Sequence, residues 1–299
     1  RQMCIRDRRR SIDFTVFLKK TMFNIANLLT SMNLICGMLS ILFCFSGQLS
    51  FAVYAIFLGA LFDFADGFVA RKLGLMSDLG KQLDSLSDLI TFGVAPGFLM
   101  FFMIILGIDD STLLENVSKD QTFYDYYILQ EFFTWVNAMF YQIPNKFDAS
   151  IKFLPFIAFL IPFFALFRLA KFNIDTRQTS NFIGFPTPLT AIIFCFFPLY
   201  FSSHMKSWNS VLEIVKLSFD CYSLAVIIVL FSAFMLLPIP LMSLKIKKSK
   251  TRENQLKLFL ILISAISIPF FKVLSIPFIL TLYFIASIYH SIKITKDEI

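Results

Sequence analysis

The chain has 299 residues, of which 57% are hydrophobic, 16% are charged and 40 are phenylalanines. A soluble domain of this length has too little interior for so much apolar surface, so the composition excludes an ordinary soluble protein and indicates a membrane protein. The net charge of +7 is typical of cytoplasmic loops beside anionic lipids, and we expect no nucleic-acid partner.

The apolar stretches predict an all-α, polytopic membrane bundle. A helix needs about 20 residues to cross the hydrocarbon layer. The fifth and seventh stretches are short, so we expect about six to eight transmembrane helices. In chain order, the expected spans are residues 25–46, 50–70, 85–107, 152–171, 187–204, 222–243, 256–271 and 273–292.

The charged residues between these stretches predict the orientation. Lysines and arginines gather in alternate loops, for example at Arg71 and Lys72 and in the run at 245–252. The long segment 108–150 is acidic instead. Because positive residues stay on the cytoplasmic side, we expect both termini in the cytoplasm and 108–150 as an external insertion.

The predicted organisation is one membrane domain, residues 23–292, between a basic cytoplasmic tail at 1–22 and a cytoplasmic tail at 293–299. Within the external insertion, residues 126–140 predict an amphipathic helix at the membrane interface. We expect Trp135 to anchor that outer interface.

Four aspartates lie where the second and third spans meet, in the stretch "DFADGFVARKLGLMSDLGKQLDSLSD". Helix positions three, four and seven apart share a face. The turn between the spans is short, so the two polar stripes are expected to face each other. The first stripe comprises Asp63, Asp66, Gly67 and Ala70, with Arg71 at its edge, and the second comprises Gly80, Asp84 and Asp88.

Such a cluster of carboxylates predicts a metal site. An ionised aspartate inside a span costs about 2.5–3.5 kcal/mol on insertion scales, and mutual repulsion adds to that cost. Oxygen ligands suit Mg²⁺ or Mn²⁺, and two such ions can hold the attacking and leaving oxygens of a phosphoryl transfer. The glycines leave room for a ligand, and Arg71 can pair with a phosphate.

The fixed positions D-x2-D-G-x2-A-R-x8-G-x3-D-x3-D over residues 63–88 resemble the signature of the CDP-alcohol phosphatidyltransferase family. The resemblance implies a helical membrane enzyme, a homodimer, that uses an alcohol to displace CMP from a CDP-activated lipid. It also implies metal-ligand roles for all four aspartates and a second role for Asp88 as the base that takes the proton of the attacking hydroxyl. The residues expected to contact the CDP-lipid are Gly67, Ala70, Arg71, Ser77 and Gly80.

The stretches "DSLSDLITFGVAPG" (84–97) and "FIGFPTPLTA" (182–191) are similar to the branch of that family whose acceptor is serine. The similarity implies CDP-diacylglycerol and L-serine as substrates and a role in phospholipid biosynthesis. We expect a bacterial inner membrane, and the charge bias assigns the site to its cytoplasmic side. Arg168 and Lys171, three residues apart, could supply the cation for the serine carboxylate.

Two alternatives stay open at this point. The same reaction could use another alcohol, such as glycerol 3-phosphate, an inositol compound or choline. In a different class, a divalent-cation transporter would also carry acids within its spans. Release of CMP discriminates the enzyme from the transporter.

Overall fold

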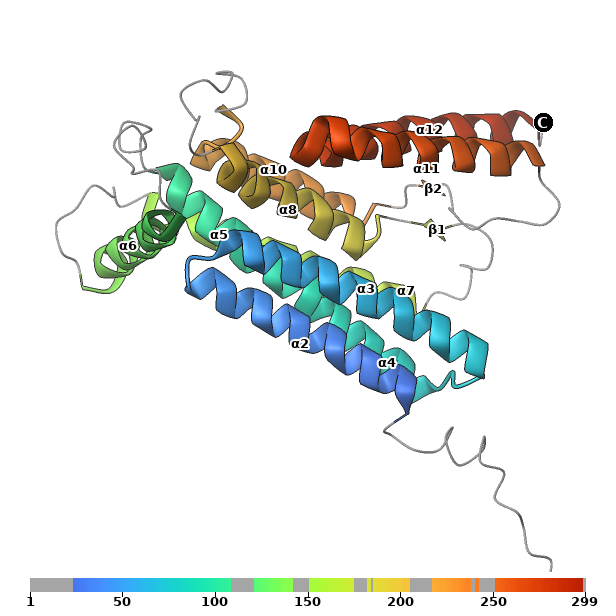
Figure 1. Cartoon of the computed structure of the whole chain (residues 1–299), viewed down its shortest axis with the longest axis horizontal. Coiled ribbons are helices and arrows are strands. Elements are labelled where there is room, and N and C mark those ends of the chain that lie inside the picture. The colour runs from blue at the N-terminus through green and yellow to red at the C-terminus, as the bar shows by residue number, and fades with distance from the viewer. Residues whose placement is uncertain are drawn as a thin grey trace, which may run out of the picture.

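The structure is a computed structural model that describes residues 24–108, 121–141, 151–174, 182–183, 185–204, 217–237, 240–241 and 251–297. The predicted tail at 1–22 and most of the insertion outside 121–141 lie beyond the described residues. The described part is a bundle of helices (Figure 1), which confirms the expected all-α, polytopic class. Its helices are α2 (Ile25–Phe45), α3 (Leu49–Leu73), α4 (Asp78–Asp88), the π-helix η1 (Leu89–Val94), α5 (Ala95–Ile108), α6 (Gln121–Phe140), the 3₁₀ helix η3 (Ile151–Phe159), α7 (Leu160–Ile174), α8 (Thr187–His204), α10 (Cys221–Phe234), α11 (Thr251–Phe271), the 3₁₀ turn η5 (Lys272–Leu274) and α12 (Ser275–Asp297).

Seven of the predicted spans fall on one of these helices or on a continuous run of them. The predicted span 222–243 is too long, because α10 ends at Phe234 and Pro240–Leu241 is the strand β2. Five segments of the described chain are long and apolar enough to cross a membrane, and Cys221–Phe234 is a shorter apolar helix. The five segments are Ile25–Phe45, Leu49–Leu73, Asp78–Ile108, Ile151–Ile174 and Lys257–Ser287.

The turn between α3 and α4 sets the position of the acidic stretch. Gly74 ends α3 with a positive φ of 65°, a conformation that glycine adopts without steric cost. Ser77 then caps α4, because its Oγ accepts the backbone N–H of Gly80 at 3.0 Å. The chain therefore reverses within a few residues, and α4 returns beside α2 (Figure 1).

The helix α5 forms the centre of the bundle. Nearly all of its side chains are buried, including Leu99, Met100 and Ile104 at 0% exposure. A helix that is apolar on every face belongs in the core. It contacts α2, which precedes it in the chain, and η3, α8 and α10, which follow it, so it connects the early helices to the later ones.

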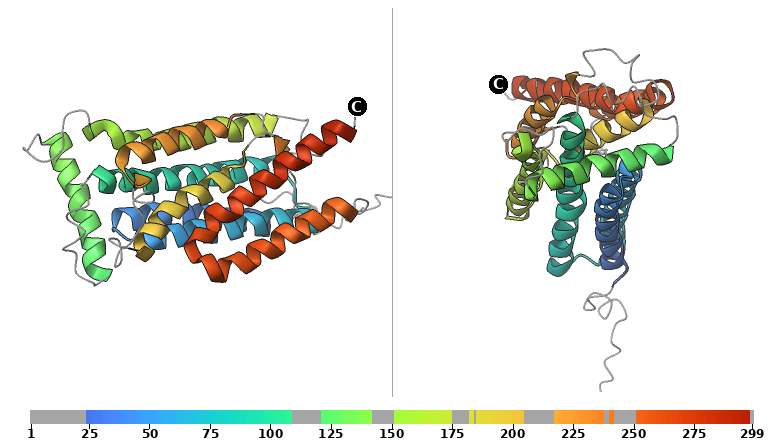
Figure 2. Two further views of the ribbon diagram at one scale, coloured as in Figure 1. Left: turned by 90° about the horizontal axis from the view of Figure 1, so that it is seen from above. Right: turned by 90° about the vertical axis from the view of Figure 1, so that its left-hand side faces the viewer.

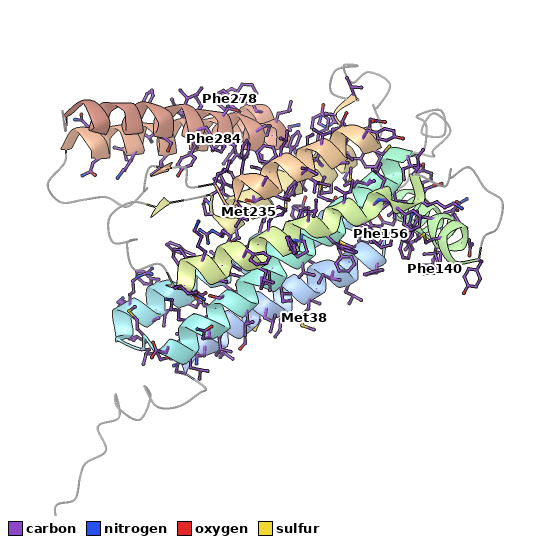
Figure 3. The ribbon with its side chains drawn as sticks, turned by 180° about the vertical axis from the view of Figure 1, so that it is seen from behind. Met38, Phe140, Phe156, Met235, Phe278 and Phe284 are labelled. Carbon is purple, nitrogen blue, oxygen red and sulfur yellow. The ribbon has the colours of Figure 1, made fainter. Side chains whose placement is uncertain are left out.

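The helix α6 is the one helix in the described residues that runs across the bundle (Figure 2). It covers the end opposite α4. Trp135 of α6 is only 3% exposed, donates its indole N–H to the Lys152 carbonyl at 2.9 Å, and packs edge-on against Phe101. The prediction that Trp135 anchors the outer interface is therefore wrong, because its ring fills the space between α5, α6 and η3. Figure 3 shows Phe156 in the same region.

The α11–α12 hairpin packs along one side of the bundle (Figure 1). Its attachment includes Phe284, stacked on Phe185 with ring centroids 5.3 Å apart. Figure 3 shows Phe278 and Phe284 on this hairpin. A small antiparallel pairing between β1 (Phe182–Ile183) and β2 (Pro240–Leu241) lies next to it, since α12 also contacts β2.

Candidate metal and phosphate site

Three of the predicted ligands converge in the structure. Asp63 and Asp66 of α3 and Asp84 of α4 each offer one carboxylate oxygen, and these oxygens all lie within 4.8 Å of one another. The two polar stripes therefore face each other, as the sequence predicts. This arrangement results from the short turn and from α2, which contacts both α3 and α4.

The fourth predicted ligand, Asp88, lies one helical turn beyond Asp84 at the end of α4. Its charge interacts with those of the three clustered carboxylates. Its Oδ1 accepts a hydrogen bond from Asn33 Nδ2 at 3.1 Å. Asp88 therefore borders the three-carboxylate cluster, with one of its oxygens already bound by a neutral donor.

The arrangement fits a divalent cation. Asp66 is only 5% exposed, and Asp84 Oδ1 is a buried oxygen without a hydrogen-bond partner in the described structure. Asp63 is repelled by both of these neighbours. Buried carboxylates that repel one another are unfavourable unless a cation lies between them. An all-oxygen donor set suits Mg²⁺ or Mn²⁺, so these residues could hold such an ion.

The basic residue next to the cluster lies over a glycine. A Cβ atom at Gly67 would be 3.3 Å from Arg71 Nη1, so the guanidinium rests against the backbone of its own helix. The charge of Arg71, whose side chain is exposed, also acts on Asp66. Arg71 is therefore available to an anion from outside, beside the carboxylates. Ala70 is half-buried on the same turn.

Ser77 and Gly80 have structural roles that the sequence did not predict. The Ser77 oxygen caps α4, which leaves its hydroxyl hydrogen to donate elsewhere. A Cβ atom at Gly80 would lie 3.1 Å from that oxygen and 3.2 Å from Asn27 Oδ1. Gly80 thus lets the start of α4 approach the start of α2. Contact of either residue with a CDP-lipid stays a prediction.

The two predicted acceptor residues differ in environment. Arg168 of α7 is half-buried, donates from Nε to the Phe185 carbonyl at 3.2 Å, and lies over the Phe172 ring. Its charge interacts with that of Asp88. Lys171 is exposed. The fold therefore brings Arg168 toward the carboxylates and leaves Lys171 at the surface.

Two hydrogen bonds join the end of α7 to α4. Asn173 donates from Nδ2 to Ser85 Oγ at 2.8 Å, and its carbonyl accepts from Lys81 Nζ at 2.9 Å. These bonds fix the end of α7 beside the turns of α4 that carry Asp84. Neither Asn173 nor Ser85 was predicted from the sequence, because a pairing across 88 residues leaves no local pattern.

Two further polar residues at the site, Thr30 and Asn33 of α2, were not predicted from the sequence. Thr30 Oγ1 donates to Asp66 Oδ2, and Asn33 Nδ2 donates to Asp88 Oδ1. One available signal was their presence, three residues apart, inside an apolar span. Polar side chains within membrane spans are uncommon enough to suggest function.

The sequence is similar to those of known proteins. The family model described as CDP-alcohol phosphatidyltransferase matches residues 23–114, which include α2, α3 and α4. A CDP-diacylglycerol–serine O-phosphatidyltransferase of Bacillus subtilis is 30% identical over 169 residues, covering 55% of this chain and 70% of that protein. A protein of the same name from Methanocaldococcus jannaschii is 28% identical over 200 residues, covering 67% and 72%. An archaetidylserine synthase of Methanothermobacter thermautotrophicus is 31% identical over 168 residues, covering 56% and 54%.

Proposed function

Since the chain belongs to the CDP-alcohol phosphatidyltransferase family, we propose that it transfers the phosphatidyl group of CDP-diacylglycerol to the hydroxyl of L-serine. The products are phosphatidylserine and CMP. The observation that carries the proposal is the set of three carboxylates whose oxygens lie within 4.8 Å of one another beside Asp88. The names of the relatives support serine as the acceptor.

The reaction needs one proton acceptor and one leaving group. The serine oxygen forms a bond to the phosphorus that carries diacylglycerol, and the bond from that phosphorus to the oxygen of CMP breaks. Asp88 takes the proton of the serine hydroxyl through the oxygen that Asn33 does not occupy. CMP leaves with the electron pair of the broken bond.

The carboxylates of Asp63, Asp66, Asp84 and Asp88 would hold Mg²⁺ or Mn²⁺, two ions in our proposal. When bound, these ions offset the negative charge of the diphosphate and of departing CMP. Arg71, exposed beside Gly67, binds a phosphate oxygen of the CDP-lipid and orients it for in-line attack.

The acceptor site requires a cation for the serine carboxylate. Arg168 is the better candidate of the two predicted residues, because its charge already acts on Asp88 while Lys171 is exposed. The Nε–carbonyl bond to Phe185 fixes the guanidinium, so its remaining N–H groups have a defined direction. The other alcohols remain the alternative acceptors.

The transporter alternative is less favoured by the described structure. A transporter of this kind typically binds its ion between broken helices near the middle of the membrane. Here the carboxylates of α3 and α4 lie toward the turn that connects them, at the end of the bundle opposite α6. We further propose a homodimer in the inner membrane of a bacterium, with this end facing the cytoplasm.

The test uses membranes that contain the protein, CDP-diacylglycerol, Mn²⁺ and labelled L-serine. Label should enter the lipid fraction with one CMP released per serine, and Asp88→Asn should abolish both. The matched control is Asp78→Asn, which removes an exposed carboxylate from the first turn of the same helix. CMP release with a different alcohol only would overturn the serine assignment, and no CMP with any acceptor would overturn the enzyme.

A further inference from the structure

The helix α2 carries none of the signature residues, yet it lies against α3, α4 and η1. It presents Thr30 and Asn33 toward the carboxylates. Their spacing of three places them on one face of the helix. Thr30 is 5% exposed and Asn33 is fully buried. Both buried side chains bond to a predicted metal ligand, and the Thr30 hydroxyl also lies 3.1 Å from the carbonyl of Ala26 in its own helix.

Each of the two residues donates one hydrogen bond to a carboxylate. Thr30 Oγ1 bonds to Asp66 Oδ2, and Asn33 Nδ2 bonds to Asp88 Oδ1 at 3.1 Å. The amide of Asn33 can point only one way, because its oxygen would repel the carboxylate. Both donors are neutral. A lysine or arginine there would satisfy the same oxygens but would oppose a divalent cation.

The backbone of α2 is fixed to the helix that carries Asp88. Ser87 Oγ donates to the carbonyl of Thr30, and Thr91 Oγ1 donates to the carbonyl of Asn33, both at 2.9 Å. The bonds therefore run in both directions. Side chains of α2 bind the carboxylates, and hydroxyls on either side of Asp88 bind the α2 carbonyls at the same two residues.

Two glycines permit this close approach. A Cβ atom at Gly37 would lie 2.6 Å from Thr91 Oγ1. One at Gly59 would lie 2.6 Å from Thr91 Cγ2 and 2.9 Å from Asn33 Oδ1. The amide oxygen of Asn33 thus lies against the backbone of α3 and has no hydrogen-bond partner in the described structure. The fold leaves that oxygen without a hydrogen bond, while the NH₂ group donates to Asp88.

We propose that Thr30 and Asn33 are positioning residues, which occupy one oxygen of Asp66 and one of Asp88 so that the other oxygens face the ion and the acceptor hydroxyl. The inference rests on the proposed function in that Asp66 binds an ion and Asp88 takes the proton. Partners that orient metal ligands in this way are typically worth 10–100-fold in metal affinity or activity.

The test makes two measurements on purified protein. The first is the Mn²⁺ concentration that gives half of the thermal stabilisation by Mn²⁺, without any substrate. The second is kcat and KM at saturating Mn²⁺. Thr30→Val should raise the half-saturating Mn²⁺ concentration by about 10-fold, while Thr30→Ser should stay within about twofold of the parent. Asn33→Leu should lower kcat by about 10–100-fold with little change in KM for CDP-diacylglycerol.

The matched control is Ser40→Ala. Ser40 lies seven residues after Asn33 on α2, is fully buried, and has a hydroxyl without a partner in the described structure. It should leave both measurements unchanged. If Thr30→Val and Asn33→Leu behave like Ser40→Ala, the inference is wrong. Should Asn33→Leu fail to fold, Asn33→Ala replaces it, with the same expected loss of kcat and the same contradiction.

The two readouts separate this inference from the proposed function. A parent protein that binds Mn²⁺ but does not use serine would overturn the serine reaction, while the change in Mn²⁺ half-saturation in Thr30→Val would still support the positioning role. A parent that binds no Mn²⁺ would overturn both. Normal Mn²⁺ half-saturation and kcat in both variants, with a working parent, would overturn the positioning role alone.

Discussion

The α2–α3–α4 end of the molecule and the α11–α12 hairpin are both apolar in sequence, but they use their polar residues differently. In the hairpin, Ser264, Ser267 and Ser275 each donate to a carbonyl three or four residues earlier. At the other end, Thr30 and Asn33 donate to carboxylates of other helices. The Thr30 hydroxyl also lies 3.1 Å from the carbonyl of Ala26, within its own helix as for the hairpin serines. The difference between the regions is therefore the additional bond from α2 to a carboxylate of another helix.

The two regions also differ in what surrounds their glycines and small residues. Gly59 has no room for a Cβ atom, since Thr91 and Asn33 lie within 3 Å of that position. Ala265 of the hairpin is exposed. The outer faces of both regions carry large exposed apolar residues, such as Met38 on α2 (Figure 3) and Phe270 on α11. Hydropathy therefore does not distinguish the two regions. The close packing around Gly59 does.

The largest expected effect comes from removing a carboxylate of the cluster. Asp84→Asn should reduce serine transfer by about 10³-fold or more, because metal stabilisation of phosphoryl transfer is worth several kcal/mol. The turnover of CDP-diacylglycerol by the purified variant measures it. Asp78→Asn is the control on the same helix. An Asp84→Asn variant with more than a tenth of the parent activity would contradict the role of the cluster.

The next effect tests the close packing at the site. Gly59→Ala should destabilise the protein by about 1–3 kcal/mol and lower kcat, since the added methyl displaces Thr91 or Asn33. Ala265→Leu, which adds bulk to an exposed position of the hairpin, should change stability by less than about 0.5 kcal/mol. Thermal unfolding in detergent compares the two. Equal effects would show that the helices at the site can separate freely.

A smaller effect is expected at the proposed acceptor cation. Arg168→Gln should raise KM for serine by about 10–150-fold, because a hydrogen bond to a charged group is worth roughly 1.5–3 kcal/mol. KM for CDP-diacylglycerol should not change. Lys171→Gln, one turn away and exposed, is the control, and steady-state kinetics measure both. A KM for serine that rises equally in the two variants would contradict the assignment to Arg168.

The smallest effect is expected in the hairpin. Ser264→Ala removes a hydroxyl that bonds to Leu260 of its own helix, so stability should change by less than about 0.5 kcal/mol and activity not at all. The matched change at the site, Thr30→Val, should alter the Mn²⁺ requirement. Stability and the Mn²⁺ requirement are measured for both variants in parallel. The same result for both would contradict the difference between the two regions.

Much of this molecule could be predicted from its sequence. The long apolar stretches determine the helices, and the spacing of Asp63, Asp66, Asp84 and Asp88 determines which carboxylates share a face. The short turn at Gly74 then brings the faces together. These features depend on residues close in the chain, so helix periodicity and turn chemistry suffice.

The remaining features depend on residues far apart in the chain. The bond from Asn33 to Asp88 spans 55 residues, and its existence depends on how close α2 comes to α4. The π-helix η1, which follows Asp88 directly, leaves no periodic signal. Trp135 was expected at a lipid interface from its position in the chain, but packing of α6 against α5 decides its burial. Tertiary contacts determine these features, and such contacts cannot be predicted from the local pattern of a single sequence.

The measurement that tests the central claim most directly is the binding of Mn²⁺ to the purified protein without substrates, followed by electron paramagnetic resonance of the free ion. The account predicts at least one ion bound per parent chain, lost in the variant that combines Asp63→Asn with Asp84→Asn and kept in Asp78→Asn. Equal binding by the parent and the double variant would contradict the claim that the carboxylates of α3 and α4 form the metal centre.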